Sequence, residues 1–390
     1  MSAYSILMVI ALSSKNTLEN NPIHAMVHTL IYSSMRRVFT SHRPLTRAGR
    51  ITIRKYIPME RSSMVVIRNI EDIPDALHGA FVTIGNFDGI HRGHQRIFRK
   101  LIDDAGRHNR KTVVITFDPH PQKVLHPERR PFFLLTHLDE KLRLLERSGI
   151  DAVVLITFTL KFARTTAEDF VRTILWDKLR LSKLFIGYDY AFGKDKRGNA
   201  AFLKTIGAKL GFEVEEIIVV KENNTIASST NIREAICEGN VKLAHTLLGR
   251  PYNVSGTVVK GYRRGTDIGI PTANIQSEKV MPTRGVYAVI VEIEGIKHRG
   301  VINIGYNPTF GNNQLSIEVH LFDFHEDIYN KHIEIFFIDR LRDEMKFDSA
   351  EKLVEQIRKD IGRARTILQT YDVSVTDPSG ILQSEDRTSY

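Results

Sequence analysis

The chain has 390 residues, of which 42% are hydrophobic, 26% are charged and one is a cysteine. This length predicts two domains with tails, and the composition is that of a globular protein. A single cysteine excludes an internal disulfide and a cysteine-based zinc site, and no stretch approaches the roughly 20 apolar residues of a membrane-spanning helix. We therefore expect a cytoplasmic location and no membrane partner.

Most of the net charge of +10 lies at the start of the chain. Residues 1–63 hold nine Lys/Arg and two acidic residues, whereas the other 327 residues carry only +3. Because the body has no basic stripe that could follow a phosphate backbone, we expect no nucleic-acid partner. The acid-poor, Arg-rich stretch at 36–55 is compatible with an organelle transit peptide. We favour a misassigned start codon, with Met59 or Met64 as the working start and residues 1–63 as a non-native or disordered leader.

Apolar strands alternate with helices from Val65 to about Leu248. We expect strands at 81–85, 112–117, 151–158, 183–190 and 213–220, and helices at 94–105, 138–149, 167–180 and 199–210. This alternation predicts a parallel sheet covered by helices on both faces. The first domain, residues 64–248, is thus expected to be a Rossmann-like, doubly wound α/β domain.

The stretch GNFDGIHRGH directly follows the first of these strands, at the sheet edge where ligands bind. Gly85 and Gly89 permit a turn whose backbone can approach a phosphate. The next helix points its N-terminal N–H groups at the same place. His91 and His94, three residues apart, fall on one face and can donate hydrogen bonds to a polyphosphate. On the residues alone, surface polarity or capping remains the alternative.

Two further loops follow strands at this edge. TFDPHP at 116–121 carries Asp118 and His120, and the alternative for it is a rigid connector. GYDYAFGKDKRGN at 187–199 mixes aromatic, glycine and charged residues, which suits the stacking of a planar ring system. A loop packed on its own aromatics is the alternative there.

SSTNIR at 228–233 predicts a second helix N-terminus suited to phosphate. Ser229 or Thr230 is expected to cap the helix, and Arg233 lies in its first turns. A plain capping box with a surface arginine is the alternative.

The pattern changes to closely spaced strands from Tyr252 onward. We expect strands at 253–259, 285–295, 296–305, 315–324 and 332–341, joined by turns with glycine, proline or asparagine. They predict a small antiparallel β-barrel, closed by a helix at 349–368. The second domain is placed at 249–371, and the polar residues 372–390 are expected to be a disordered tail.

RRGTDIGIPTANI at 263–275 is the most informative stretch of the second domain. Gly265 and Gly269 give a backbone that can wrap a phosphate, and Pro271 fixes the chain before Thr272 and Asn274. A hydroxyl and an amide oxygen are hard ligands suited to Mg²⁺. A simple glycine-proline turn is the alternative.

LSIEVHLFDF at 315–324 alternates strictly, so Glu318 lies on the polar face of a barrel strand. A solvated, idle carboxylate is the usual reading of one such glutamate. Opposite a metal–phosphate loop, it could instead take a proton from an attacking hydroxyl.

Taken together, these motifs resemble the bacterial bifunctional riboflavin kinase/FAD synthetase family. The resemblance covers roughly residues 65–370 and includes the HxGH signature of nucleotidyltransferases at 91–94. It also rests on LLGRPY (247–252), GIPTAN (269–274), NPTFG (307–311) and EVHLFDF (318–324). Two positions depart from the family pattern: Thr266 replaces a basic residue and Ile270 replaces a phenylalanine.

The resemblance implies two reactions: ATP-dependent phosphorylation of riboflavin to FMN by the barrel, and adenylylation of FMN to FAD by the α/β domain. In the adenylyltransferase, ATP would be bound by Gly85, Phe87, Asp88, Gly89, His91, His94, Ser229, Thr230 and Arg233. The flavin would be bound by Asp118, His120, Asp189 and Phe192. In the kinase, the substrates would be bound by Gly265, Gly269, Pro271, Thr272, Asn274 and Asn307.

The implied catalytic groups are Glu318 as the kinase base and the two histidines of the HxGH signature, with Thr272 and Asn274 as ligands of Mg²⁺ held with ATP. Two other functions stay open: a single-activity nucleotidyltransferase for another phosphorylated acceptor, and a non-enzymatic flavin-binding regulator. The sequence also leaves a homo-oligomer open.

Overall fold

A computed structural model of the chain describes residues 63–129, 132–260, 269–306 and 315–372. The expected leader up to residue 62 and the tail from residue 373 lie outside these residues. So do Gly265 and Asn307 of the expected kinase site. Among the described residues, no helix is both long enough and apolar enough to span a lipid bilayer.

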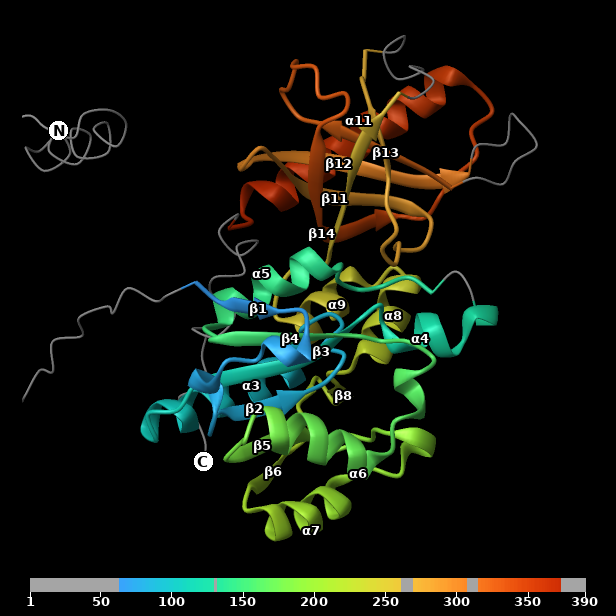
Figure 1. Cartoon of the computed structure of the whole chain (residues 1–390). Coiled ribbons are helices and arrows are strands. Elements are labelled where there is room, and N and C mark those ends of the chain that lie inside the picture. The colour runs from blue at the N-terminus through green and yellow to red at the C-terminus, as the bar shows by residue number, and fades with distance from the viewer. Residues whose placement is uncertain (1–62, 130–131, 261–268, 307–314, 373–390) are drawn as a thin grey trace, which may run out of the picture. The chain divides into compact units, whose positions relative to one another are not determined.

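The first domain is built on a parallel sheet, as predicted, and this sheet has six strands (Figure 1). Its spatial order is β1-β4-β3-β2-β5-β6. A short edge strand, β1, precedes the strand that the sequence analysis took as the first. The strands are β1 (Val65–Ile67), β2 (Phe81–Ile84), β3 (Thr112–Asp118), β4 (Ala152–Thr157), β5 (Lys183–Gly187) and β6 (Glu213–Ile217).

Helices cover both faces of this sheet. On one face, α3 and α5 pack on alternate strand residues such as Phe81 and Val114, while on the other face η5 and α7 pack on Val82 and Val113. Gly149 ends α5 in the left-handed conformation. The helices are α3 (Arg92–Arg107), α4 (Pro121–Leu125), α5 (Leu138–Ser148), α6 (Ala167–Asp169), the π-helix η5 (Phe170–Lys178) and α7 (Ala200–Leu210). A small hairpin, β7 (Lys221–Glu222) with β8 (Thr225–Ile226), leads to α8 (Ser229–Cys237) and α9 (Val241–Leu248).

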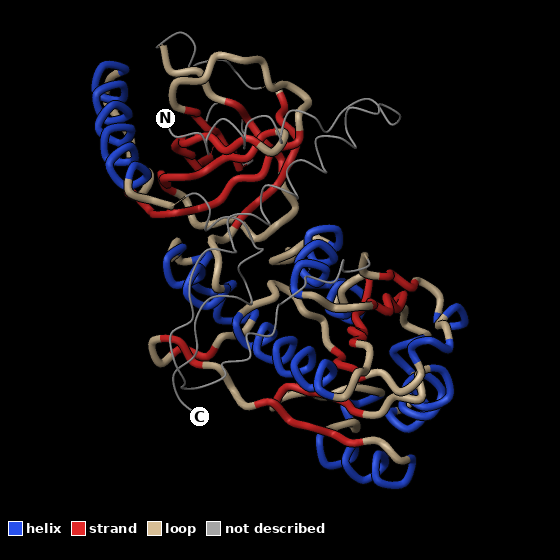
Figure 2. Tube along the Cα trace, turned by 90° about the vertical axis from the view of Figure 1, so that its left-hand side faces the viewer, coloured by secondary structure: helices blue, strands red, loops and turns tan. Residues whose placement is uncertain are grey.

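The second domain is a closed six-stranded barrel in the order β10-β13-β12-β11-β14-β9, with every neighbouring pair antiparallel. Figure 2 shows its strands in red with α11 beside them. The sequence analysis missed β10, which begins in the last two residues of the GIPTAN motif. The elements are β9 (Asn253–Val259), β10 (Ala273–Gln276), β11 (Gly285–Ile293), β12 (Ile296–Tyr306), β13 (Leu315–Leu321), β14 (His332–Arg342) and α11 (Ala350–Gln369).

One hydrophobic core belongs to both domains. Buried residues of α8 and α9, such as Ile236 and Leu247, pack with barrel residues such as Val289 and Phe337 in a single cluster. The helices that end the first domain are therefore part of the packing of the second.

Candidate functional site

The turn between β2 and α3 is strained. Phe87, Gly89 and Ile90 have φ values of 47°, 89° and 39°, in the left-handed region. Such values are uncommon outside glycine and are unfavourable for a β-branched residue. We call residues 85–91 the phosphate loop. The loop ends at His91, the N-cap of α3, so the N-terminal N–H groups of that helix follow it directly.

His91 and His94 lie face to face, with ring centroids 3.6 Å apart and an interplanar angle of 24°. The Nδ1 atom of each ring is buried and has no hydrogen-bond partner among the described residues. Burial lowers the pKa of His91 to about 3, against the opposing effect of the Asp88 carboxylate. Burial, and after it the charge of His91, also lowers the pKa of His94. The two imidazoles are therefore neutral at physiological pH.

Asp88 anchors the phosphate loop rather than facing solvent, with only 2% of its surface exposed. Its carboxylate accepts hydrogen bonds from the backbone N–H groups of Leu135 and Thr136, at 3.0–3.2 Å, and from the Thr136 hydroxyl at 3.1 Å. It also forms an ion pair with Arg233. Asp88 thus ties the loop to the segment before α5 and holds the guanidinium of Arg233 in place.

The cap of α8 differs from the prediction by one residue. Ser228, not Ser229 or Thr230, is the N-cap, and its hydroxyl accepts from the N–H of Asn231 at 3.2 Å. The Ser229 hydroxyl instead donates to the carbonyl of Asp88 at 2.8 Å. The serine pair therefore both caps α8 and attaches it to the phosphate loop.

A cavity of about 1000 Å³ lies over the carboxyl ends of the sheet strands. It is lined by all the residues expected to bind ATP or flavin in this domain except Gly89 and Asp118. Those lining it are Gly85, Phe87, Asp88, His91, His94, His120, Asp189, Phe192, Ser229, Thr230 and Arg233. Gly89 holds the loop by donating its N–H to Thr136 Oγ1 at 3.0 Å. Asp118 is exposed at the end of β3.

His120 and Phe192 are packed against other aromatic side chains. His120 is 8% exposed and stacks on Phe132, with ring centroids 5.0 Å apart. Its Nδ1 accepts from the N–H of Gln122 at 3.2 Å. Burial lowers the pKa of His120 to about 4. Phe192 stacks on Tyr190 at 5.4 Å. The 187–199 loop therefore packs on its own aromatics and lines the cavity at once.

The sequence analysis missed an aromatic wall of this cavity. Phe158 and Phe162 lie directly after β4 and line the cavity with Phe170 and the exposed Tyr188. The rule that ligands bind beyond the carboxyl ends of parallel strands would have found the first two. The sequence analysis also missed Lys141, a buried residue of α5 whose Nζ donates to the carbonyl of Asn86 at 2.7 Å.

In the barrel, strand register brings two of the expected kinase residues together. Asn274 of β10 pairs with Glu318 of β13 as direct neighbours. Ile317 and Val319 point into the buried core, so Glu318 lies on the opposite face with Ser316, whose hydroxyl donates to its carboxylate at 2.9 Å. The Nδ1 of His320 lies 2.8 Å from the carbonyl of Pro271, which attaches the GIPTAN turn to the same strand.

The donor set beside Glu318 fits Mg²⁺. Asn274 shares a face of the sheet with the glutamate, because the two residues are direct partners in neighbouring strands. Thr272, which carries a hydroxyl, directly precedes β10. Mg²⁺ prefers a few oxygen ligands and completes its shell with water and phosphate oxygens. Among the described residues, no group of three or more His, Cys, Asp and Glu is placed to hold a metal.

Two family models match the two domains in order. The model described as FAD synthetase matches residues 73–231, and the model described as riboflavin kinase matches residues 248–368. A crystal structure described as a macrolide-efflux protein from Streptococcus pneumoniae has a TM-score of 0.71 and 37% identity. It covers 80% of this chain and 100% of that chain. This likeness supports the fold of both domains.

Curated relatives match the chain over both domains. A bifunctional riboflavin kinase/FMN adenylyltransferase of Buchnera aphidicola subsp. Acyrthosiphon pisum is 40% identical over 302 residues, which are 76% of this chain and 96% of the relative. The protein of the same description from Escherichia coli (strain K12) is 37% identical over 307 residues, 77% of this chain and 97% of the relative. The chain therefore belongs to the bifunctional riboflavin kinase/FMN adenylyltransferase family, with an FAD synthetase domain followed by a riboflavin kinase domain.

Proposed function

We propose that His91 and His94 bind the phosphates of ATP in the adenylyltransferase. The observation that supports this most directly is their neutral, stacked arrangement at the start of α3, with a buried and unpartnered Nδ1 on each ring among the described residues. Neutral imidazoles can donate N–H to phosphate oxygens, and the helix N-terminus adds further donors. Ser229, Thr230 and Arg233 also line the cavity and would be further phosphate partners.

In the proposed reaction, a phosphate oxygen of FMN attacks the α-phosphorus of ATP. A P–O bond forms between FMN and AMP, the bond from the α-phosphorus to the bridging oxygen breaks, and pyrophosphate leaves with the electron pair. The protein needs only to position the two substrates and neutralise charge. The flavin would lie along the aromatic wall, beside His120, Asp189 and Phe192.

We propose that Glu318 is the general base of the kinase. Its carboxylate would take the proton of the terminal ribityl hydroxyl as that oxygen attacks the γ-phosphorus of ATP, and ADP leaves. Thr272 and Asn274 would hold Mg²⁺ with the ATP phosphates, and the metal would neutralise charge on the transferred group. Gly265, Gly269, Pro271 and Asn307 would shape the nucleotide and flavin loops. The register of Asn274 against Glu318 supports this arrangement.

The domain limits that we propose are 64–248 and 249–371, in line with the matches to the two family models. We also propose that the enzyme acts in the cytoplasm on ATP and flavins without a nucleic-acid partner. The near balance of charge in residues 64–390 supports the last point.

The division of labour is tested with two substitutions in the full chain. His94→Ala should abolish FAD formation from FMN and spare FMN formation from riboflavin. Glu318→Gln should do the reverse, because it keeps the shape of the side chain and removes its basicity. Chromatography of riboflavin, FMN and FAD over time, with ATP and Mg²⁺ present, reads both activities. Loss of both activities in either folded variant would contradict the proposal.

A further inference from the structure

The strained turn of the phosphate loop is held by two side chains from outside it. The carbonyl of Ile90 accepts from Gln95 Nε2 at 2.8 Å and from Arg250 at 3.1 Å. The second guanidinium NH₂ of Arg250 donates to the carbonyl of Gly89 at 2.8 Å. Left-handed backbone at a non-glycine residue persists only where its surroundings fix it. These three hydrogen bonds supply that restraint at the two residues before His91.

Arg250 comes from a distant part of the chain. It follows α9 and stands three residues before β9, the first strand of the barrel, and it lies 160 residues after Ile90 in sequence. Gln95 also donates to the carbonyl of Leu248 at 2.7 Å, so the end of α9 is attached to the same turn. The phosphate loop of the first domain is therefore fixed by the segment that begins the second.

Arg250 is placed to act on the loop and not on a substrate. Its side chain is buried, with 7% of the residue exposed, and it is not among the residues that line the cavity. Both of its terminal nitrogens are engaged by loop carbonyls. A planar guanidinium can reach two carbonyls at once, whereas a lysine ammonium acts as a point charge on a flexible stem.

We propose that Arg250 is a positioning residue for FMN adenylylation, which holds the Gly89–Ile90 turn so that His91 and His94 face the cavity. This proposal rests on the proposed role of the two histidines in binding ATP. A displacement of about 1 Å in a positioning element can cost on the order of 100-fold in rate. The kinase activity of the same chain provides an internal reference, because the hydrogen bonds that Arg250 makes to the described residues go to the phosphate loop.

The experiment compares four variants of the full chain, with kcat and KM measured separately for FAD formation from FMN and for FMN formation from riboflavin. Arg250→Met should lower kcat of adenylylation by about 10- to 100-fold, because a loop displaced by up to about 1 Å loses up to on the order of 100-fold in rate. The rate of riboflavin phosphorylation and the KM for FMN should stay within about twofold of the parent. Arg250→Lys should also lower kcat of adenylylation by at least about threefold, since it keeps the charge and loses the fork.

Tyr252→Phe is the matched control for damage to the domain junction. Tyr252 lies two residues after Arg250, is buried, and donates its hydroxyl to the carbonyl of Val280 at 2.6 Å. Removal of this hydroxyl should lower the urea concentration at the midpoint of unfolding and leave the ratio of the two activities unchanged. His94→Ala, the fourth variant, tests the histidine role on which the proposal rests.

Several outcomes would overturn the proposal. If Arg250→Met lowers both activities together, or lowers only the urea midpoint as Tyr252→Phe does, Arg250 is a structural residue. If Arg250→Met does not fold, Arg250→Lys decides: full adenylylation in that variant means that charge alone suffices and the fork does not position the loop. If His94→Ala loses FAD formation and Arg250→Met keeps it in full, only this inference is refuted. If His94→Ala keeps full activity, the proposed histidine role is refuted.

Discussion

At the scale of single residues, the neutral histidines of the phosphate loop connect the site to the stability of the fold. His91 is 6% exposed, and burial lowers its pKa from 6.5 to about 3. In the unfolded chain its imidazole would titrate near its ordinary value. Between these two values the unfolded state binds a proton that the folded state does not. The free energy of unfolding therefore falls as pH decreases through this window.

We predict that His91 alone lowers the free energy of unfolding by about 2 kcal/mol between pH 7 and pH 5. Urea denaturation across this range measures the slope. His91→Gln, which does not titrate, should flatten it. His325→Gln, at an exposed position, serves as the control and should leave it unchanged. Since the lowered pKa values of His94 and His120 act in the same direction, some slope should remain in His91→Gln. An unaltered slope in that variant would contradict the prediction.

The sequence analysis could predict the site of these histidines because they lie in a short motif directly after a strand, at a known spacing. Spacing along the chain and the position of the sheet edge are local properties. The contact of Arg250 with the phosphate loop could not be predicted in this way, because Ile90 lies 160 residues away in the sequence. The sequence analysis noted Arg250 only as part of LLGRPY. Asp88 was expected to bind ATP, and it lines the cavity; that its carboxylate also accepts from the backbone of Leu135 and Thr136 could not be predicted. A backbone partner leaves no sequence signal.

At the scale of elements, the shortest barrel strand brings together two of the residues proposed for the kinase site. β10 has four residues and follows a proline, so its pattern is too short to predict a strand. The longer barrel strands and the α/β alternation were confirmed because each has enough residues to show its period. Yet β10 carries Asn274 to the position beside Glu318. The structure thus adds a neighbour relation that the motifs only suggested.

We predict that Gly256→Ala impairs the kinase selectively. A Cβ at this position of β9 would lie 2.1 Å from the carbonyl oxygen of Gln276 in β10. Relief of this clash requires β10 to move, at a cost of about 1–3 kcal/mol in stability. FMN formation should fall while FAD formation from supplied FMN is retained. The two chromatographic assays and urea denaturation test this.

Gly362→Ala in α11 is the matched glycine substitution. A Cβ there meets nothing within 4 Å, so this variant should gain about 0.5–1 kcal/mol of stability from the helix propensity of alanine and keep both activities. Equal losses of activity in the two variants would show that the β9–β10 contact is unrelated to the kinase site.

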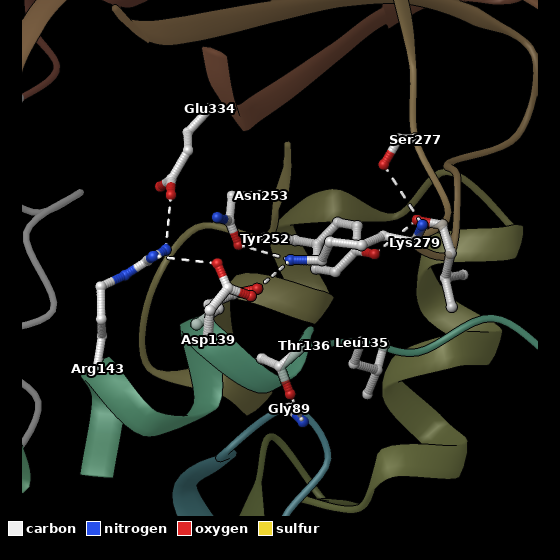
Figure 3. Close-up of polar contacts among 12 residues, drawn as sticks. Gly89, Leu135, Thr136, Asp139, Arg143, Tyr252, Asn253, Ser277, Lys279 and Glu334 are labelled. Atoms are coloured by element: carbon white, nitrogen blue, oxygen red, sulfur yellow. Dashed lines mark hydrogen bonds and ion pairs between the residues drawn. The ribbon is translucent and has the colours of Figure 1, made fainter. Parts of the chain in front are cut away.

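At the scale of the whole molecule, a buried ion pair joins the two domains. Lys279, in the barrel, has a fully buried side chain whose Nζ donates to Glu140 of α5 at 2.7 Å and to Asn253 at 3.0 Å. Figure 3 shows Lys279 directed at Asn253. It also shows Arg143 of α5, which contacts Asp139 of the same helix and Glu334 of the barrel strand β14. Backbone pairing of Val280 with Leu134, at 3.1 Å, continues this junction.

We predict that Lys279→Met lowers the free energy of unfolding by about 3–5 kcal/mol, because it leaves the Glu140 carboxylate buried without its partner. Lys279→Met combined with Glu140→Met should recover most of this loss. Urea denaturation, followed by both activities in parallel, measures the effect. Since the shared core couples the domains, both activities should disappear over one transition in every variant. Two separate transitions would show that the domains unfold independently.

The shared core also has a genetic consequence. Substitutions at the buried faces of α8 and α9 alter packing that the barrel and the phosphate site both use. We therefore expect a single mutation there to change the supply of FMN and of FAD together, so that the two steps of flavin synthesis would vary as one trait. Changes that affect one step alone are expected at positions outside these buried faces, such as the aromatic wall of the cavity or the outer face of β13.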